Sequence, residues 1–330
     1  MKGNNKKRSI PLWILIVLDV LIAGAVLCVF AYFHHVVSSE QESEHIIITP
    51  PTSLVSPSTD GTGEKPYGEW AEKFAEHFSD EVTVTENSYK SPNISITITE
   101  HRNAADTCTY YVADVYISDI RCIGSYLAKG KYGENITEKG LEMFAASGAV
   151  FAMNGDYYGA RNTGLCLRNG EIYRSSIIKN QDVCILYYDG TMETFLGEDF
   201  DLDYVIDKKA YQGWAFGPSL LDEDGKALDK YPSWYNKIGG VNPRSAIGYY
   251  EPGHYCFVAI DGRSDVSAGM TFKEMSELME DLGCKVAYNL DGGISSFMAY
   301  NGKYVHKPAP AWGADAPRAI SDCIIIKEPF

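Results

Sequence analysis

The sequence predicts an α+β domain with a mixed β-sheet core, hairpins and one right-handed β-α-β crossover, preceded by a single transmembrane helix. Two apolar runs, residues 257–260 and 286–290, each end in an aspartate-glycine turn, and a helical pattern lies between them. Strand, helix and strand in this order indicate a crossover between two parallel strands, and such crossovers are almost always right-handed. Short alternating segments elsewhere indicate antiparallel hairpins.

The N-terminal 33 residues predict a membrane anchor. Residues 10–33 form an apolar run of 24 residues whose only charge is Asp19. At about 1.5 Å per residue, this helix spans a hydrocarbon core of roughly 30 Å. Basic residues in segment 1–9 predict that this segment is cytoplasmic and that the C-terminal domain is extracellular. Because the run is longer than that of a cleaved signal peptide, we expect a single-pass signal-anchor in the cell membrane.

Composition divides the remainder into two parts. Residues 34–66 are rich in Ser, Thr and Pro, which predicts a disordered tether. Residues 67–330 carry the strand and helix patterns of one folded domain. The net charge of -15 argues against nucleic acid and anionic lipid as ligands. The membrane is therefore expected as a partner only through the N-terminal helix.

Segments with alternating or clustered β-branched and aromatic residues predict the strands of this domain. Asn-Gly and Asp-Gly dipeptides between several of them predict hairpin turns. The expected strands occupy residues 82–84, 94–99, 110–117, 149–153, 165–173, 183–188, 192–195, 246–250, 255–260, 286–290, 297–300, 304–306 and 320–326. Helices are expected at 137–146 and 271–282. The second begins with a capping box of Thr271 and Glu274 and stops at Gly283.

The eight cysteines form no evident metal or disulfide framework. Cys28 lies in the predicted anchor, which leaves an odd number in the rest of the chain, and no C-x-x-C motif is present. A zinc site is therefore not expected. Several cysteines lie in strand-like apolar runs, which favours buried thiols, although one or two disulfides are compatible with an extracellular domain. The spacing alone predicts no pairing.

Asp261 and Asp291 are the candidate catalytic residues, one at the end of each strand of the crossover. Because parallel strands end at the same edge of a sheet, we expect both carboxylates in one pocket. Asp-Gly is also an ordinary turn dipeptide, and either motif alone favours a turn over a site. Two carboxylates in one crevice favour hydrolysis at an anomeric carbon, in which one activates water or attacks.

Polar residues in the same and neighbouring motifs are candidate substrate-binding residues. Arginines hold phosphate through paired hydrogen bonds. Glycines beside a carboxylate expose backbone N–H groups that can cradle an anionic oxygen. The candidate binding residues are Asn154, Asp156, Arg244, Arg263, Ser264, Asn289, Gly292, Gly293, Ser295 and Arg318.

These motifs resemble those of the phosphodiester glycosidase family. The resemblance extends from about Asn93 to Lys327 and is carried by NGDYYG, NPRSAIGY, AIDGRSDVSAGMTFKEMSELMEDLGCKVAYNLDGGISSFM and RAISD. Family members typically have NGGFF where this chain has NGDYY, so Asp156 is an added carboxylate. The resemblance covers most of the segment 67–330, which is therefore expected to be a phosphodiester glycosidase-like domain.

The resemblance implies hydrolysis of the glycosidic bond of a sugar-1-phosphodiester, of the alpha-N-acetylglucosamine-1-phosphate type. Combined with the predicted anchor, it implies a substrate in a cell-envelope glycan or exopolysaccharide. Asp261 and Asp291 are then the carboxylate pair, and Arg244 and Arg263 grip the phosphate. The residues expected to hold sugar hydroxyls or phosphate oxygens are Asn154, Asp156, Ser295, Gly292 and Gly293.

Two alternatives remain at the level of sequence. No cofactor is required by the first mechanism, but a calcium or magnesium ion could be shared by Asp156, Asp261 and Asp291, because hard cations prefer oxygen ligands. The domain could also be a non-catalytic glycan-binding or envelope-assembly module that keeps the pocket without the chemistry. The added carboxylate at Asp156 favours this second alternative.

Overall fold

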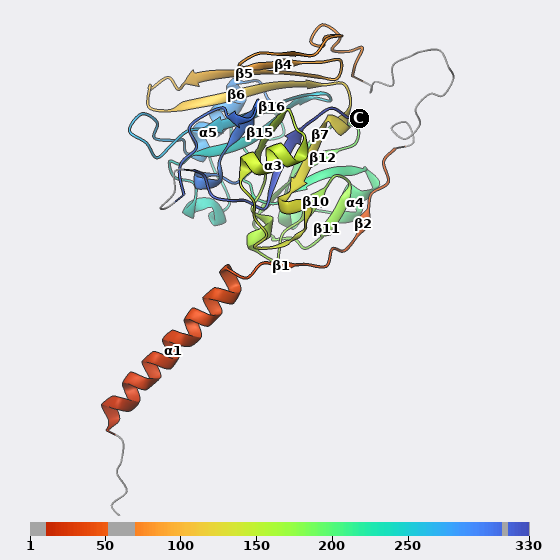
Figure 1. The fold of residues 1–330 in the computed structure, drawn as a ribbon. Helices are drawn as coiled ribbons and strands as arrows, with labels where there is room; N and C mark the ends of the chain where they lie inside the picture. The colour runs from red at the N-terminus through yellow and green to blue at the C-terminus, as the bar shows by residue number, and fades with distance from the viewer. Residues whose placement is uncertain (1–10, 52–69, 312–315, 330) are drawn as a thin grey trace, which may run out of the picture. The chain divides into compact units, whose positions relative to one another are not determined.

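The computed structural model describes residues 11–51, 70–311 and 316–329. The chain separates into two units, residues 1–39 and residues 40–330. Each unit is described by itself below. The elements are labelled in Figure 1.

The first unit contains one long helix, α1 (Leu12–His35), which has no polar face. Its segment Leu12–Phe33 is long and apolar enough to cross a membrane, although an N-terminal signal sequence has the same properties. The helix begins and ends two residues later than the sequence predicts. The basic segment 1–9 lies outside the described residues, so its predicted cytoplasmic location stays a prediction.

The second unit is built from three antiparallel sheets. In a seven-stranded sheet the order is β17 (Val286–Asn289), β15 (Arg244–Glu251), β16 (His254–Ile260), β6 (Thr109–Ile117), β5 (Ile94–Arg102), β4 (Ser88–Lys90) and β3 (Thr83–Val84). In a six-stranded sheet it is β13 (Met192–Leu196), β12 (Asp182–Tyr187), β14 (Ala210–Trp214), β10 (Cys166–Arg168), β11 (Glu171–Arg174) and β2 (Ile46–Ile47). In a five-stranded sheet it is β19 (Lys303–Tyr304), β18 (Met298–Tyr300), β9 (Phe151–Asn154), β20 (Asp322–Ile326) and β7 (Ile123–Leu127).

The remaining elements are short. Strands β1 (Ser39–Glu40) and β8 (Gly133–Glu134) have two residues each. The helices are α3 (Gly140–Ser147), α4 (Leu202–Asp207) and α5 (Phe272–Asp281). Figure 1 shows β4, β5 and β6 along one side of the domain and β10 and β11 on the opposite side.

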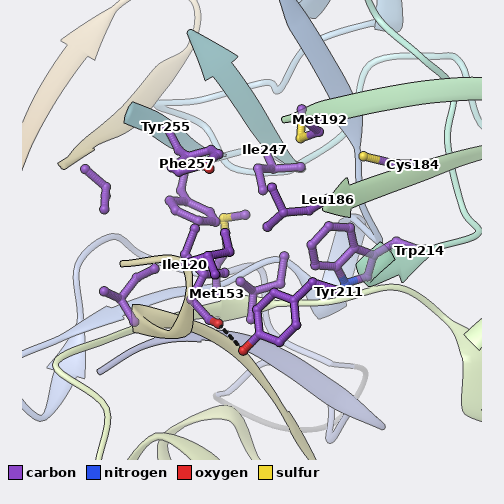
Figure 2. Close-up of a cluster of buried hydrophobic side chains, with 14 of the residues drawn as sticks. Ile120, Met153, Cys184, Leu186, Met192, Tyr211, Trp214, Ile247, Tyr255 and Phe257 are labelled. Carbon is purple, nitrogen blue, oxygen red and sulfur yellow. Dashed lines mark hydrogen bonds between the residues drawn. The ribbon is translucent and has the colours of Figure 1, made fainter. Parts of the chain in front are cut away.

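One hydrophobic core is shared by the three sheets. Phe257 from β16, Met153 from β9 and Trp214 from β14 all belong to it and are fully buried. Figure 2 shows these side chains converging between the sheets. The hydroxyl of Tyr211 donates a hydrogen bond of 2.8 Å to the carbonyl of Ile123, which joins β14 to β7. The mixture of strands and helices predicted from the sequence is confirmed.

The outer faces of two sheets are each covered by a helix. Along β16, Phe257 faces the shared core, whereas Val258 faces Met275 and Met279 of α5, as the two-residue period of a strand requires. In the same way, α3 covers the outer face of the five-stranded sheet. The helix predicted at 271–282 is confirmed as α5, which spans 272–281.

The crossover differs from the prediction in one respect. Strands β16 and β17 are not neighbours, because β15 lies between them and pairs antiparallel with both. The two strands therefore run in the same direction without a parallel ladder, and the strand pairs of the three large sheets are antiparallel. The expected parallel neighbours are wrong because α5 carries the chain past one strand position. The hand of the crossover stays a prediction.

Part of the predicted tether belongs to the folded domain. Strand β2 pairs antiparallel with β11, and the side chain of Ile48 is buried. Apolar burial of this kind holds the segment 46–48 in place, so the tether prediction is wrong there. Residues 52–66 of the predicted tether lie outside the described residues.

The first prediction concerns the start of α5. The hydroxyl of Thr271 accepts from the backbone N–H of Glu274 at 3.2 Å, and the Glu274 carboxylate accepts from the N–H of Thr271 at 2.8 Å. Thr271→Ala should lower the free energy of unfolding by about 1 kcal/mol in urea denaturation, because the backbone N–H of Glu274 loses the hydroxyl that accepts its hydrogen bond. Thr271→Ser keeps the hydroxyl and is the control. An equal loss in both variants would contradict the cap.

Candidate active site

A small pocket lies at the carboxyl ends of β9 and β17. Its volume is about 160 Å³, and Asp291, Arg318, Tyr157, Thr137 and Ser321 are among its lining residues. Asp291 follows β17, and Tyr157 follows β9, so each is placed at a strand end. This is the type of edge at which the sequence predicts a site.

An ion pair between Asp291 and Arg318 forms one wall of this pocket. Nη2 of Arg318 donates to Oδ2 of Asp291 at 2.7 Å, and its Nε donates to the hydroxyl of Ser295. The guanidinium lies over the ring of Tyr157, 4.8 Å from its centroid. Burial acts to lower the pKa of Arg318, but the Asp291 carboxylate outweighs it and the net pKa is raised. Arg318 therefore stays charged in a half-buried position.

Asn154 holds this wall in place from behind. Its Nδ2 donates to the carbonyls of Asp291 at 2.6 Å and Gly155 at 3.1 Å. Its Oδ1 accepts from the hydroxyl of Ser245 at 2.7 Å and from the N–H of Phe297 at 3.1 Å. The side chain is buried and all of its polar atoms are used. In this arrangement the side chain positions the Asp291 backbone, and the prediction that Asn154 binds substrate stays a prediction.

Asp261 binds a histidine rather than facing Asp291. Its Oδ1 lies 2.6 Å from Nδ1 of His306, and Nε2 of His306 accepts the N–H of Met298 at 2.9 Å. Because Nε2 is an acceptor, the proton of the neutral imidazole is on Nδ1, which donates to Asp261. The imidazole is buried, and the Asp261 side chain is 13% exposed. The sequence indicated no partner for His306, which ends a predicted strand and lies 45 residues from Asp261.

Asp261 and Asp291 lie at the same edge but do not share the described pocket. Asp291 lines it, and Asp261 is not among its lining residues. Strand β15 separates the two strand ends. Buried hydrogen bonds connect the two sides, because Asn154 accepts from the N–H of Phe297 and His306 accepts from the next N–H along the chain. The prediction of a single shared pocket is therefore not confirmed.

Asp156 is part of a buried ionic network beneath the pocket. The Arg168 guanidinium contacts Oδ1 of Asp156 at 2.9 Å and Oδ2 of Asp322 at 2.8 Å, and all three side chains are fully buried. Asp156 also accepts from the N–H groups of Tyr158 and Ala215. The Asp156 backbone lies at the pocket, but its carboxylate points into the network. The prediction that Asp156 contacts substrate stays a prediction, and in this structure its carboxylate is paired with Arg168.

Asp322 has an unusual proton affinity. Its carboxyl is fully buried, and this burial raises its pKa to about 7. Arg168 acts in the opposite direction, and the nearby carboxylates of Asp156 and Asp291 add to the increase. The Asp322 carboxyl therefore exchanges a proton near neutral pH directly behind the pocket.

Arg244 does not reach the pocket. Its Nε donates to the carbonyl of Met270 at 3.0 Å, and its Nη2 donates to the carbonyls of Ile238 and Gly240. The guanidinium lies 4.0 Å from the ring centroid of Phe272 on α5. Burial, with a smaller contribution from Arg263, lowers its pKa to about 10. The side chain faces α5 in this structure, and the prediction that Arg244 grips a phosphate stays a prediction.

The amides of Gly292 and Gly293 are also occupied. The N–H of Gly292 donates to Oδ1 of Asp291 at 2.9 Å, and the N–H of Gly293 donates to the carbonyl of Pro243 at 2.9 Å. Both amides thus have acceptors within the chain, and the predicted cradle for phosphate oxygens stays a prediction. The close approach still requires glycine, because a Cβ at 292 would lie 2.7 Å from the Pro243 oxygen.

Three other predicted residues have different surroundings. Asn289 is buried, and its Nδ2 donates to the carbonyl of Gly217 at 2.7 Å. The hydroxyl of Ser264 donates to the carbonyl of Ser267 and closes an exposed turn. Arg263 is exposed, and its guanidinium lies next to Gly293, where a Cβ would be 3.2 Å from Nη2. Of these three, only Arg263 presents a charged group to solvent near the pocket.

The proposed metal ligands do not come together. Asp156 pairs with Arg168, Asp261 with His306, and Asp291 with Arg318. Across residues 11–51, 70–311 and 316–329 there is no group of three His, Cys, Asp or Glu side chains that could hold a metal ion. The donor set that the alternative mechanism needs is therefore not assembled by these residues.

The fold and pocket define an α+β protein with a carboxylate–arginine pair at a strand edge. A model of the phosphodiester glycosidase family matches residues 147–327, which is more than half of the chain. The chain therefore belongs to the phosphodiester glycosidase family, as its motifs predict. Membership in this family supports a glycosidase-type hydrolase.

Individual relatives agree with this assignment at the level of the fold. The catalytic domain of zebrafish N-acetylglucosamine-1-phosphodiester alpha-N-acetylglucosaminidase, auto-inhibited by its pro-peptide, is similar with a TM-score of 0.56 and 20% identity, over 75% of this chain and 88% of that chain. A hypothetical protein from Synechocystis has a TM-score of 0.50 and 14% identity, over 75% of this chain and 64% of that one.

One curated sequence is also similar. The SPbeta prophage-derived uncharacterized protein YomE of Bacillus subtilis (strain 168) is 29% identical over 203 residues, which is 60% of this chain and 31% of the relative. This chain thus spans about a third of the length of that relative.

The second prediction concerns Asp322. The pKa of Asp322 is raised in the folded state, so the folded protein holds this proton more tightly than the unfolded chain does. Its contribution to the free energy of unfolding is therefore present at low pH and is lost as the pH rises through 7. The free energy of unfolding of the wild type, minus that of Asp322→Asn, should fall between about pH 4 and pH 7. Urea denaturation across this range measures it. Asp224→Asn, at an exposed turn, is the control. A flat or rising difference would refute the assignment.

Proposed function

We propose that the domain hydrolyses the glycosidic bond of a sugar-1-phosphodiester, of the alpha-N-acetylglucosamine-1-phosphate type. The observation that carries this proposal is the pairing of Asp291 with Arg318 in the pocket beside Tyr157. A carboxylate suits an anomeric carbon, a guanidinium suits a phosphate, and an aromatic ring suits the face of a sugar. All three groups lie in the segment that matches the family.

In this mechanism Asp291 is the catalytic carboxylate and Arg318 is the phosphate ligand. The phosphate of the substrate competes with Asp291 for the Arg318 guanidinium, because both are anions. When the phosphate binds, Oδ2 of Asp291 is released to attack the anomeric carbon or to activate a water molecule. The phosphate is an acidic leaving group, so charge neutralisation by Arg318 matters more than a strong general acid.

The other proposed residues act around this pair. Ser295 orients Arg318 through the hydrogen bond to Nε, and Asn154 positions the Asp291 backbone. Arg263 is the second cation that can reach the substrate phosphate from solvent. Asp261 is the proposed second carboxylate, because its side chain is partly exposed and His306 fixes one of its oxygens. Ser264 would contact only a substrate that extends over the exposed turn.

The proposed location is the outer face of the cell membrane. Helix α1 acts as a single-pass anchor, and the basic segment 1–9 remains in the cytoplasm. In this location the substrate is a sugar phosphodiester of the cell envelope or of an exopolysaccharide. The same helix supports the proposal that the membrane is a partner.

A non-catalytic glycan-binding module is the second candidate. Both oxygens of Asp291 already accept hydrogen bonds, from Gly292 and from Arg318. A binding module would retain this closed arrangement, whereas the enzyme must open it during each cycle. Binding without turnover would favour the module.

The third prediction separates these candidates. Purified protein should release free sugar from N-acetylglucosamine-1-phosphoryl conjugates, and Asp291→Asn should reduce the rate at least about 100-fold, because the amide can neither attack nor accept a proton. Asp224→Asn should retain the full rate. Sugar release by Asp291→Asn at the wild-type rate would remove Asp291 from the mechanism. Calorimetric binding by the wild type without any release would leave the binding module.

The fourth prediction concerns metal ions. Dialysis against excess EDTA should leave the rate of sugar release unchanged, because Arg318 neutralises the phosphate and the three carboxylates are separated. The rate is compared before dialysis, after dialysis, and after calcium or magnesium is added back. Loss of activity that either ion restores would establish the metal-assisted mechanism instead.

A further inference from the structure

Two cysteines meet beneath α5. The sulfur atoms of Cys256 and Cys284 are 3.6 Å apart, and both residues are buried. Cys256 is in β16, at the start of the crossover, and Cys284 follows α5, at its end. The two residues are separated by 28 positions in sequence.

The space for this sulfur pair is provided by Gly248 in the neighbouring strand. A Cβ at 248 would lie 2.6 Å from the sulfur of Cys256 and 2.7 Å from that of Cys284. Gly248 is directly opposite Cys256 in the β15–β16 ladder. The two sulfur atoms therefore occupy the volume that any larger residue at 248 would fill. The contact between the two sulfur atoms therefore depends on a glycine at position 248 in β15.

We propose that Cys256 and Cys284 are joined by a disulfide bond in the protein at the cell surface. A disulfide has an S–S distance of about 2.0 Å, so the sulfur atoms must approach by about 1.5 Å. Rotation of the two side chains above Gly248 supplies this movement. The inference depends on the proposed extracellular location, where disulfides persist, and not on the proposed glycosidase activity.

The oxidant is a disulfide of small thiols or of a thiol–disulfide oxidoreductase. The thiolate of one cysteine attacks a sulfur of that disulfide, forms a mixed disulfide and releases one thiolate. The second protein thiolate then attacks the mixed disulfide and releases the other. Two protein thiols are thus oxidised by two electrons, the external disulfide is reduced to two thiols, and the two protons pass to those thiols.

The disulfide forms while the domain is folding. The hydrogen bond with Cys284, together with burial, raises the pKa of Cys256 well above its ordinary value, so the folded reduced protein contains little reactive thiolate. Before α5 packs on the sheet, both thiols are open to the oxidant. Once the domain closes, the same burial protects the bond from reductants.

The bond would hold the two ends of the crossover together. Asp261 lies after β16, and Asp291 lies after β17, so both strand ends adjoin the closed loop. Closing this loop lowers the entropy of the unfolded chain and stabilises the domain. Within residues 70–311 and 316–329, Cys256 and Cys284 form the one pair of cysteines whose sulfur atoms are in contact. Cys184 is a buried cysteine outside this pair.

The test uses the full chain, expressed in a bacterium with its own N-terminal helix. The protein is denatured in the presence of excess N-ethylmaleimide, so that each free thiol is alkylated as it becomes exposed, and its peptides are mapped by mass spectrometry without reduction. We expect a linked peptide pair containing Cys256 and Cys284, and an alkylated Cys184. Alkylation of both Cys256 and Cys284, or linkage of either one to another cysteine, would overturn the proposal.

Thermal unfolding supplies the second measurement. Refolding from denaturant in a phosphine reductant should lower the midpoint of the wild type by about 5 °C relative to protein refolded without it, and it should leave the Cys256→Ala/Cys284→Ala variant unchanged. Cys184→Ala is the matched control and should keep the reductant-dependent shift. An equal shift in the double variant would assign the effect to other cysteines and overturn the pairing. A linked pair in a protein without sugar release would leave this inference intact while the proposed function fails.

Discussion

The structure of the candidate site depends on the hydrogen bonds of one buried amide, that of Asn154. Its Nδ2 holds the carbonyl of Asp291, and its Oδ1 holds Ser245 and the N–H of Phe297. Through this single side chain, the end of β9 is tied to the ends of β15 and β17. A buried amide is costly unless its donors and acceptors are satisfied, and here they are. The position of Asp291 therefore follows from the packing of two sheets rather than from its own turn.

The two residues after Asn154 also make close contacts in the interior. Gly155 packs so closely on Asp322 that a Cβ would lie 2.5 Å from its Oδ1. Asp156 then pairs with Arg168 and accepts the N–H of Ala215 just after β14. The Asp156 carboxylate thus helps to balance the charge of a buried arginine. It gives no support to the binding-module alternative.

Much of the fold could be predicted from the sequence because its signals are local. The capping box and the apolar face of α5 lie within twelve residues, and the alternation within each strand identifies its buried face. Strand neighbours depend on the whole sheet, however, so the insertion of β15 between β16 and β17 could not be seen in either strand. Ile46 and Ile47 were expected in a tether for a related reason: their partner strand, β11, is distant in sequence.

For the site residues too, local patterns were predictable from the sequence and contacts between distant segments were not. Arg244 has the same strand parity as Ala246, which faces α5, so alternation along β15 places its guanidinium under the helix. Asp261 lies one residue beyond β16, and it meets His306, which is 45 residues away in sequence, so alternation along β16 does not predict this contact. The residue type alone predicted the chemistry of these groups but not their direction. Asp291 and Arg318 meet because both lie beyond regular strands, where parity no longer applies.

The charges in and beneath the pocket explain why, in the proposed mechanism, phosphate binding comes before release of the Asp291 carboxylate. Asp291 and Arg318 neutralise each other in the pocket, whereas Asp156 and Asp322 share Arg168 beneath it. The carboxylates of Asp156 and Asp322 are fully buried, so a substrate phosphate cannot reach Arg168. It can replace only the Asp291 carboxylate, as the partner of Arg318. Because the exchange frees the Asp291 carboxylate, substrate binding and activation of the nucleophile or base become one step under the proposed function. A neutral sugar cannot displace the carboxylate from Arg318, and this provides a physical basis for selecting phosphodiesters over ordinary glycosides.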